Sequence, residues 1–80
     1  ESWGGNVLGI HVGETYDKAI ELMKERGYAL YKEREGRGEN IRYAYEKDYV
    51  TIVFEVTPDN EIVEIFVNIW DPYNTQMWIA

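Results

Sequence analysis

Apolar and polar side chains alternate with a helical period between residues 16 and 26. The apolar positions recur at i, i+3, i+4 and i+7, at Tyr16, Ala19, Ile20 and Met23. Thr15 precedes the segment as a capping residue, and Gly27 follows it as the left-handed residue that commonly ends a helix. The pattern predicts one amphipathic helix that begins near Tyr16 and needs a sheet to cover its apolar stripe.

A period of two, typical of strands, runs through four later segments: 28–35, 41–46, 49–57 and 61–70. In the last two segments the apolar positions of one face are expected to contact the helix: Val50, Ile52, Phe54, Val56, Val63, Ile65, Val67 and Ile69. A shorter alternation over residues 7–12 predicts an N-terminal strand or extended segment. The sequence thus predicts an α+β fold, with one amphipathic helix packed on a four-stranded antiparallel meander sheet.

The two ends of the chain differ in composition from its middle. The whole chain is short enough for one hydrophobic core, so we expect a single domain. A glycine-rich start predicts a flexible lead over residues 1–6. The tail, residues 71–80, contains Tyr73, Met77 and Trp78, and we expect this apolar segment to pack back onto the domain.

Strand register follows from the rule that facing residues of antiparallel strands share a face of the sheet. A four-residue loop at residues 58–61 satisfies this rule and predicts these pairs: Thr57 with Ile62, Val56 with Val63, Phe54 with Ile65, Glu55 with Glu64, and Val53 with Phe66. A tight turn at Lys47-Asp48 predicts a second set: Tyr45 with Val50, Tyr43 with Ile52, and Arg42 with Val53. Tyr43 and Tyr45 then lie on the core side of the sheet.

The sheet face turned away from the helix carries the strongest candidate site. It is expected to have an apolar centre and a charged rim: Val53, Phe66 and Trp70 in the centre, with Arg42, Glu55 and Glu64 around them. An apolar centre inside a charged rim is typical of protein-binding surfaces. We therefore predict a non-catalytic binding or inhibitor module whose partner is another protein. The alternative is that the C-terminal tail covers this face.

Other functions fit the same face. Aromatic rings on a flat sheet can stack on sugar rings, which would make the protein a carbohydrate-binding module, with Asn68, Glu64 and Thr51 to bond hydroxyl groups. The face could also join two copies of the chain as a homodimer. Glu55 and Glu64, about 5 Å apart, have the spacing of a retaining glycosidase, but an open sheet has no cleft to exclude water. We therefore expect no enzyme.

Composition and charge exclude several further classes of function. The 80 residues include 15 acidic and 8 basic side chains, a formal charge of −7, and no cysteine. Residues 46–80 hold Lys47 as their only base, and such an acidic half predicts no binding to nucleic acid and disfavours docking on anionic lipid. No apolar run approaches the length of a membrane helix, so we expect no membrane insertion. His11 is the single histidine and there is no cysteine, so the chain has too few ligands for a typical zinc site and too few residues for nucleophilic catalysis. The segment Asp59-Asn60-Glu61 lacks the sequence pattern of a calcium-binding loop. We expect no cofactor and no metal.

An extended lead-in, a glycine and a capped helix follow one another in the stretch LGIHVGETYDKAIELM at residues 8–23. A YAY strand at residues 43–45 and a VTPDNEIV hairpin at residues 56–63 come later. In this order of motifs the chain resembles the small exported domains of the SmpA/OmlA group and the repeat unit of β-lactamase inhibitory proteins. The resemblance implies a non-catalytic envelope or secreted protein that binds another protein. The start at Glu1 adds the expectation of a processed chain located outside the cytoplasm.

Overall fold

The computed structural model describes residues 6–70 and 76–79, and within them the chain forms one helix and two antiparallel sheets. The first sheet is a short hairpin of β1 (Asn6–Val7) and β2 (Ile10–His11), which precedes the helix α1 (Tyr16–Glu25). The second is a meander of consecutive strands: β3 (Ala29–Glu35), β4 (Ile41–Lys47), β5 (Val50–Val56), β6 (Ile62–Trp70) and β7 (Gln76–Ile79). The predicted α+β fold, a helix with an antiparallel meander, is confirmed.

β7 is a fifth strand of the meander that the hydrophobic pattern did not predict. It pairs with β6 between Val67↔Ile79 and Trp70↔Gln76. These four residues of the tail therefore do return to the sheet, as an edge strand. The rest of the predicted tail and of the N-terminal lead lies outside the described residues, except Asn6, which belongs to β1.

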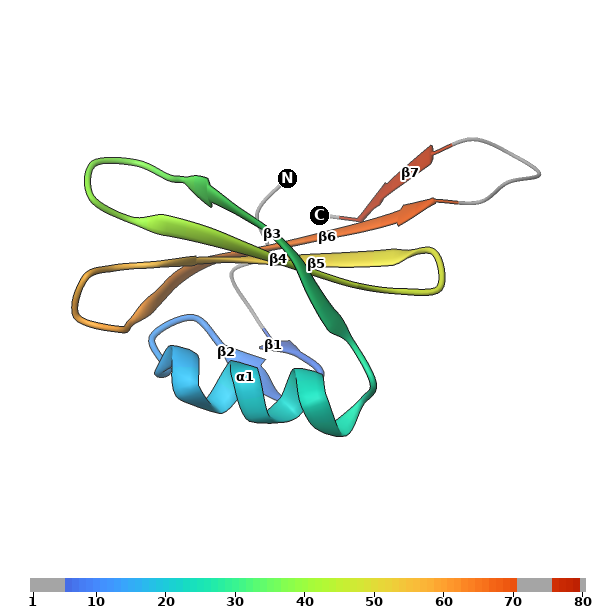
Figure 1. Cartoon of the computed structure of the whole chain (residues 1–80), viewed down its shortest axis with the longest axis horizontal. Helices are drawn as coiled ribbons and strands as arrows, with labels where there is room; N and C mark the ends of the chain where they lie inside the picture. The colour runs from blue at the N-terminus through green and yellow to red at the C-terminus, as the bar shows by residue number, and fades with distance from the viewer. Residues whose placement is uncertain (1–5, 71–75, 80) are drawn as a thin grey trace.

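α1 lies along one face of the meander, and the core fills the space between them (Figure 1). The buried core combines the apolar stripe of the helix with one face of the strands: Ile10, Tyr16, Ala19, Met23, Tyr45, Ile52, Phe54, Val56, Ile62 and Ile65. Tyr16 stacks on Tyr43 with ring centroids 4.3 Å apart, and its hydroxyl lies 2.6 Å from that of Tyr45. Burial, followed by this hydrogen bond, raises the pKa of Tyr16 far above its usual range.

The two ends of α1 are held in different ways. At the C-terminal end, Gly27 adopts the predicted left-handed conformation with φ of 82°, and the Tyr28 amide donates to the Met23 carbonyl at 2.8 Å. At the N-terminal end, Thr15 makes no side-chain capping bond, contrary to the prediction. The Tyr16 amide instead donates to the Asn60 carbonyl at 2.9 Å, so the β5–β6 loop satisfies the first turn of the helix.

The N-terminal segment is a tight hairpin instead of the single extended strand that its alternation predicted. Leu8 and Gly9 form its turn with φ of 53° and 91°, which are the left-handed conformations that two-residue hairpin turns require. Ile10 of this segment enters the core, with 2% of its surface exposed. Leu8 and Val12 stay exposed, with 38% and 37% of their surface accessible.

The β5–β6 register agrees with the prediction along most of its length. Phe54 faces Ile65, Glu55 faces Glu64 and Val53 faces Phe66. A bulge between Glu55 and Val56 then pairs Val56 with Ile62 in place of Val63. As a result Ile62 is fully buried, and Val63 is only partly so.

The β4–β5 register differs from the prediction by two residues. The turn consists of Asp48 and Tyr49, not Lys47 and Asp48, because Asp48 has the positive φ of 54° that a two-residue hairpin needs. The observed pairs are Tyr45 with Ile52, Tyr43 with Phe54, and Arg42 with Glu55. A shift of two preserves the faces of the strand, so both tyrosines remain on the core side as predicted.

Candidate functional site

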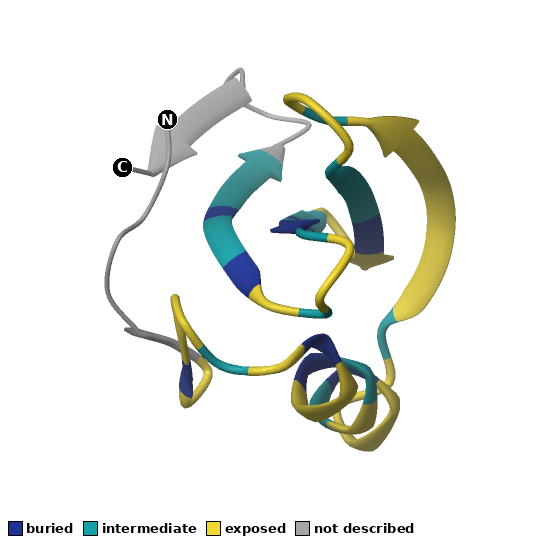
Figure 2. Cartoon of the chain, turned by 90° about the vertical axis from the view of Figure 1, so that its left-hand side faces the viewer, coloured by how far each residue is buried: buried dark blue, intermediate teal, exposed yellow. Residues whose placement is uncertain are grey.

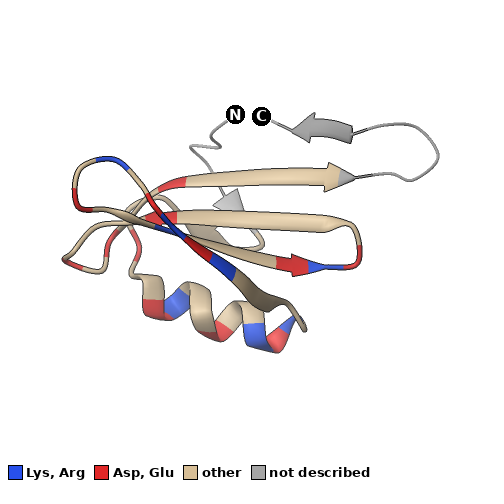
Figure 3. Cartoon of the chain, turned by 45° about the horizontal axis from the view of Figure 1, so that its top comes forward, with Lys and Arg blue, Asp and Glu red and all other residues tan. Residues whose placement is uncertain are grey.

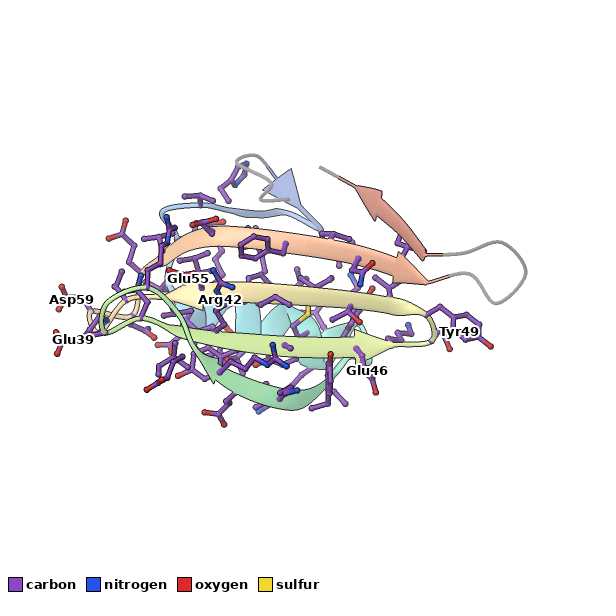
Figure 4. All side chains as sticks on the ribbon, turned by 90° about the horizontal axis from the view of Figure 1, so that it is seen from above. Glu39, Arg42, Glu46, Tyr49, Glu55 and Asp59 are labelled. Carbon is purple, nitrogen blue, oxygen red and sulfur yellow. The ribbon has the colours of Figure 1, made fainter. Side chains whose placement is uncertain are left out.

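The sheet face opposite α1 is hollowed into a pocket, where we expected an open surface. The pocket has a volume of about 310 Å³ and is bounded by side chains of β3, β4, β5 and β6. Val53 and Phe66, the predicted centre of the site, both line it, and so does Arg42 from the predicted rim. Seen from this face, Arg42 and Glu55 lie together above the strands (Figure 4).

β3 closes one side of the pocket and supplies residues that sequence reasoning missed. A bulge between Leu30 and Lys32 leaves Tyr31 without a partner on β4, so Lys32 pairs with Ala44 and Arg34 pairs with Arg42. An unbulged ladder would have put Glu33 opposite Arg42 and turned Lys32 to the other face, because a slip of one residue reverses every side chain. The bulge therefore directs Lys32 and Arg34 into the pocket.

The charge pattern of β3 follows from this register (Figure 3). Lys32 and Arg34 point to the pocket, whereas Glu33 and Glu35 pair with Tyr43 and Ile41 on the other face. No ion pair or hydrogen bond of either basic side chain occurs within the described residues. A protein with a formal charge of −7 thus has a cationic wall on its concave face.

Glu55 is buried on this face in a network of hydrogen bonds, whereas we expected it on an exposed rim. Its side chain has 0% of its surface exposed. Arg42 Nε donates to Glu55 Oε1 at 2.8 Å, and Asn40 Nδ2 donates to Oε2 at 2.8 Å. The backbone amide and Nε of Arg37 both approach Oε2 at 3.4 Å. The residues of the β3–β4 loop thus supply donors that make burial of this carboxylate possible.

The same contacts set the ionisation of Glu55. Burial by itself raises its pKa, but the hydrogen bonds from Asn40, Arg42 and Arg37 outweigh burial and lower the pKa to about 2. The carboxylate is therefore ionised at neutral pH. A general acid needs a raised pKa, so this carboxyl is unsuited to protonate a leaving group.

Arg37 also bonds to Glu64, the residue that faces Glu55 on β6. The like charges of the two glutamates are thus offset by Arg37 and Arg42. Gly36 lies close beside them, because a Cβ atom at this position would be 3.0 Å from the carboxyl carbon of Glu55. A side chain at this position would therefore force the carboxylate or the loop to shift slightly.

Two of the three residues predicted for the centre of the face, Val53 and Phe66, are neighbours in the structure. Val53 faces Phe66 across β5 and β6, and the Arg42 guanidinium lies 5.0 Å from the centroid of the Phe66 ring. The side-chain oxygen of Asn68, another pocket residue, is buried without a hydrogen-bond partner in residues 6–70 and 76–79. The backbone of Trp70 ends β6 opposite Gln76, and its side chain lies outside the described part of the structure.

The remaining candidate chemistry lies near the start of the helix. Glu14 accepts a hydrogen bond from Lys18 Nζ at 2.6 Å and one from the His11 amide at 2.6 Å, and these lower the pKa of Glu14 to about 2. Within the described ranges, no cluster of three or more histidine, aspartate or glutamate side chains is arranged to hold a metal ion. Nor does that part of the chain contain a helix long and apolar enough to cross a membrane.

Comparison with protein-family models gives no match, and comparison with curated proteins and with solved structures gives no significant match. The resemblance to the SmpA/OmlA group and to β-lactamase inhibitory proteins stays a prediction.

Proposed function

We propose that this protein is a non-catalytic binding module that engages another protein through the concave face of its β3–β6 sheet. The observation that carries the proposal is the pocket of about 310 Å³, which is lined by Val53, Phe66 and Arg42. This volume is at the lower end of the range found for ligand pockets, which suits one or two side chains of a partner better than a large cofactor. The resemblance to exported domains supports a location outside the cytoplasm.

The composition of the pocket also favours protein recognition. Phe66 offers an aromatic surface that is braced by Arg42, and aromatic and arginine side chains dominate the energetics of protein interfaces. Glu55 and Glu64 contribute indirectly, because they fix the arginine side chains that frame the pocket.

The test is selection of peptides from a random display library on the intact protein, followed by NMR mapping of the selected peptides. We expect shift changes that centre on Val53 and Phe66, and a loss of affinity of at least tenfold in Phe66→Ala. Val12→Ala is the matched control, because Val12 is an exposed apolar residue outside the pocket, and it should leave affinity unchanged. Peptides that map to α1 instead would refute the proposal. Soluble glycans that move the same resonances would favour the carbohydrate-binding alternative.

A further inference from the structure

β3 is an edge strand whose outer side has no partner strand in the described part of the structure. All seven of its residues are exposed, so both faces as well as the edge contact solvent (Figure 2). An edge of this kind presents unpaired backbone N–H and C=O groups to any extended segment that approaches it. Main-chain pairing of this type is a general mode of peptide recognition.

The charges of β3 disfavour pairing between two copies of the chain. If the β3 strands of two copies paired antiparallel about a two-fold axis, the concave faces of both copies would lie on the same side of the combined sheet. Lys32 and Arg34 would then lie against the same two cations of the second copy, and Glu33 and Glu35 against its two anions. Like charges directly opposite one another destabilise a strand pair, so this edge is protected against self-association.

The same pattern specifies a different partner strand. The concave face carries the basic side chains Lys32, Arg34, Arg37 and Arg42 against the carboxylates Glu55 and Glu64. The two carboxylates are already paired with Arg37 and Arg42, which leaves the cations of β3 without an internal counter-ion in the described residues. Lys32 and Arg34 are two residues apart, so their side chains leave the same face of the strand at points about 6.6 Å apart. Carboxylates at every second position of an extended peptide have the same spacing.

We propose that the outer edge of β3 binds an extended peptide segment of the partner protein as an added strand, with acidic side chains at alternate positions over Lys32 and Arg34. This inference rests on the proposed function, and it names the chemistry of the partner. The peptide backbone pairs with β3, and its carboxylates lie above the cationic wall of the pocket. Tyr31, which the bulge leaves unpaired at the mouth of the pocket, is available to contact an apolar residue of the same segment.

The experiment uses capped synthetic peptides that alternate threonine with glutamate, with glutamine or with lysine, titrated onto the full chain. We expect the glutamate peptide to bind at least tenfold more tightly than the glutamine peptide, and the lysine peptide not to bind. The double variant Lys32→Glu with Arg34→Glu should reverse this order and prefer the lysine peptide. The control variant Lys24→Glu with Arg26→Glu changes the net charge equally, at the C-terminal end of α1, and should preserve the order. Equal affinities, or an unchanged order in the β3 variant, would overturn the inference.

Two N-methylated glutamate peptides test whether the backbone pairs. One carries methyl groups on the threonine amides and the other on the glutamate amides. Amides of alternate residues point to opposite edges of a strand, so only one of the two peptides should bind. Equal behaviour of the two would exclude strand addition. If library-selected peptides map to Val53 and Phe66 while the charge series shows no preference, the proposed function stands and this inference fails; if no peptide reaches the concave face, both fail.

Discussion

Replacement of Glu55 by glutamine should destabilise the protein at neutral pH and have little effect in acid. The ordinary carboxyl pKa of 4.5 applies to the unfolded chain, whereas the folded value is about 2. Because the folded pKa is the lower one, the ionised network stabilises the protein above pH 4.5, and this stabilisation is lost as the pH falls toward 2. The difference corresponds to about 3 kcal/mol, which we reduce to about 2 kcal/mol because solvent around the exposed Arg37 and Arg42 screens the interaction.

The assay is urea unfolding of the wild-type protein and Glu55→Gln at a series of pH values. At pH 7 the variant should lose about 2 kcal/mol, which is roughly 10 °C in Tm for a chain of this size. The difference between the two proteins should begin to shrink below pH 4.5 and fall to less than half near pH 3. Glu14 titrates in the same window, but it does so in both proteins and cancels from the difference.

A second substitution tests whether the β3–β4 loop acts through this carboxylate. Gly36→Ala places a methyl group 3.0 Å from the Glu55 carboxyl carbon, so the carboxylate or the loop must move. We expect a loss of about 1 to 2 kcal/mol in the wild-type background and a smaller loss in Glu55→Gln, since neighbouring residues of one network are not additive. A loss in Glu55→Gln that is the same at pH 7 and pH 3, together with additive behaviour of Gly36→Ala, would refute the reasoning.

Two further predictions concern parts of the fold remote from the concave face. Tyr16→Phe and Tyr45→Phe should each cost about 1 to 2 kcal/mol, because either change leaves a buried hydroxyl without the partner it has at 2.6 Å. The double variant should cost less than the sum, and full additivity in urea unfolding would count against the hydroxyl pair. Leu8→Asn should raise the free energy of unfolding by about 1 kcal/mol, because asparagine tolerates the φ of 53° better than leucine does and the Leu8 side chain is exposed. An unchanged or lower stability of this variant would show that the backbone conformation at residue 8 does not reduce the free energy of unfolding.

The hydrophobic pattern was sufficient to predict α1 and the two central strands. Over β5 and β6, alternate valine, isoleucine and phenylalanine residues leave only one face that can be buried, so the register of Phe54 with Ile65 follows from local sequence. Gly27 likewise marks the end of the helix, because its left-handed φ of 82° is a conformation that few other residues adopt. Predictions of this kind depend on neighbours within a few residues along the chain.

The features that define the concave face depend on contacts between distant residues, and the pattern did not reveal them. Over residues 32–35 of β3, the charges alternate in sign along the strand, so no apolar position in this stretch determines which set points to the core. The bulge at Tyr31 settles the question, and a bulge has no reliable sequence signal of its own. Glu55 was expected on the surface because an isolated carboxylate is costly to bury. Its donors come from Arg37, Asn40 and Arg42, which lie 13 to 18 residues earlier in the chain.

The electrostatic character of the site therefore cannot be derived from the net charge. Summed over the chain, acids outnumber bases by seven, which favoured a negative surface. On the concave face, however, the two acids are bound by Arg37 and Arg42, so they neutralise those arginines and have little attraction left for other groups. The cations that lack such partners in the described residues are those of β3, the strand whose register the bulge controls. Local pairing and one extra residue in one strand thus decide the sign of the charge that the concave face presents.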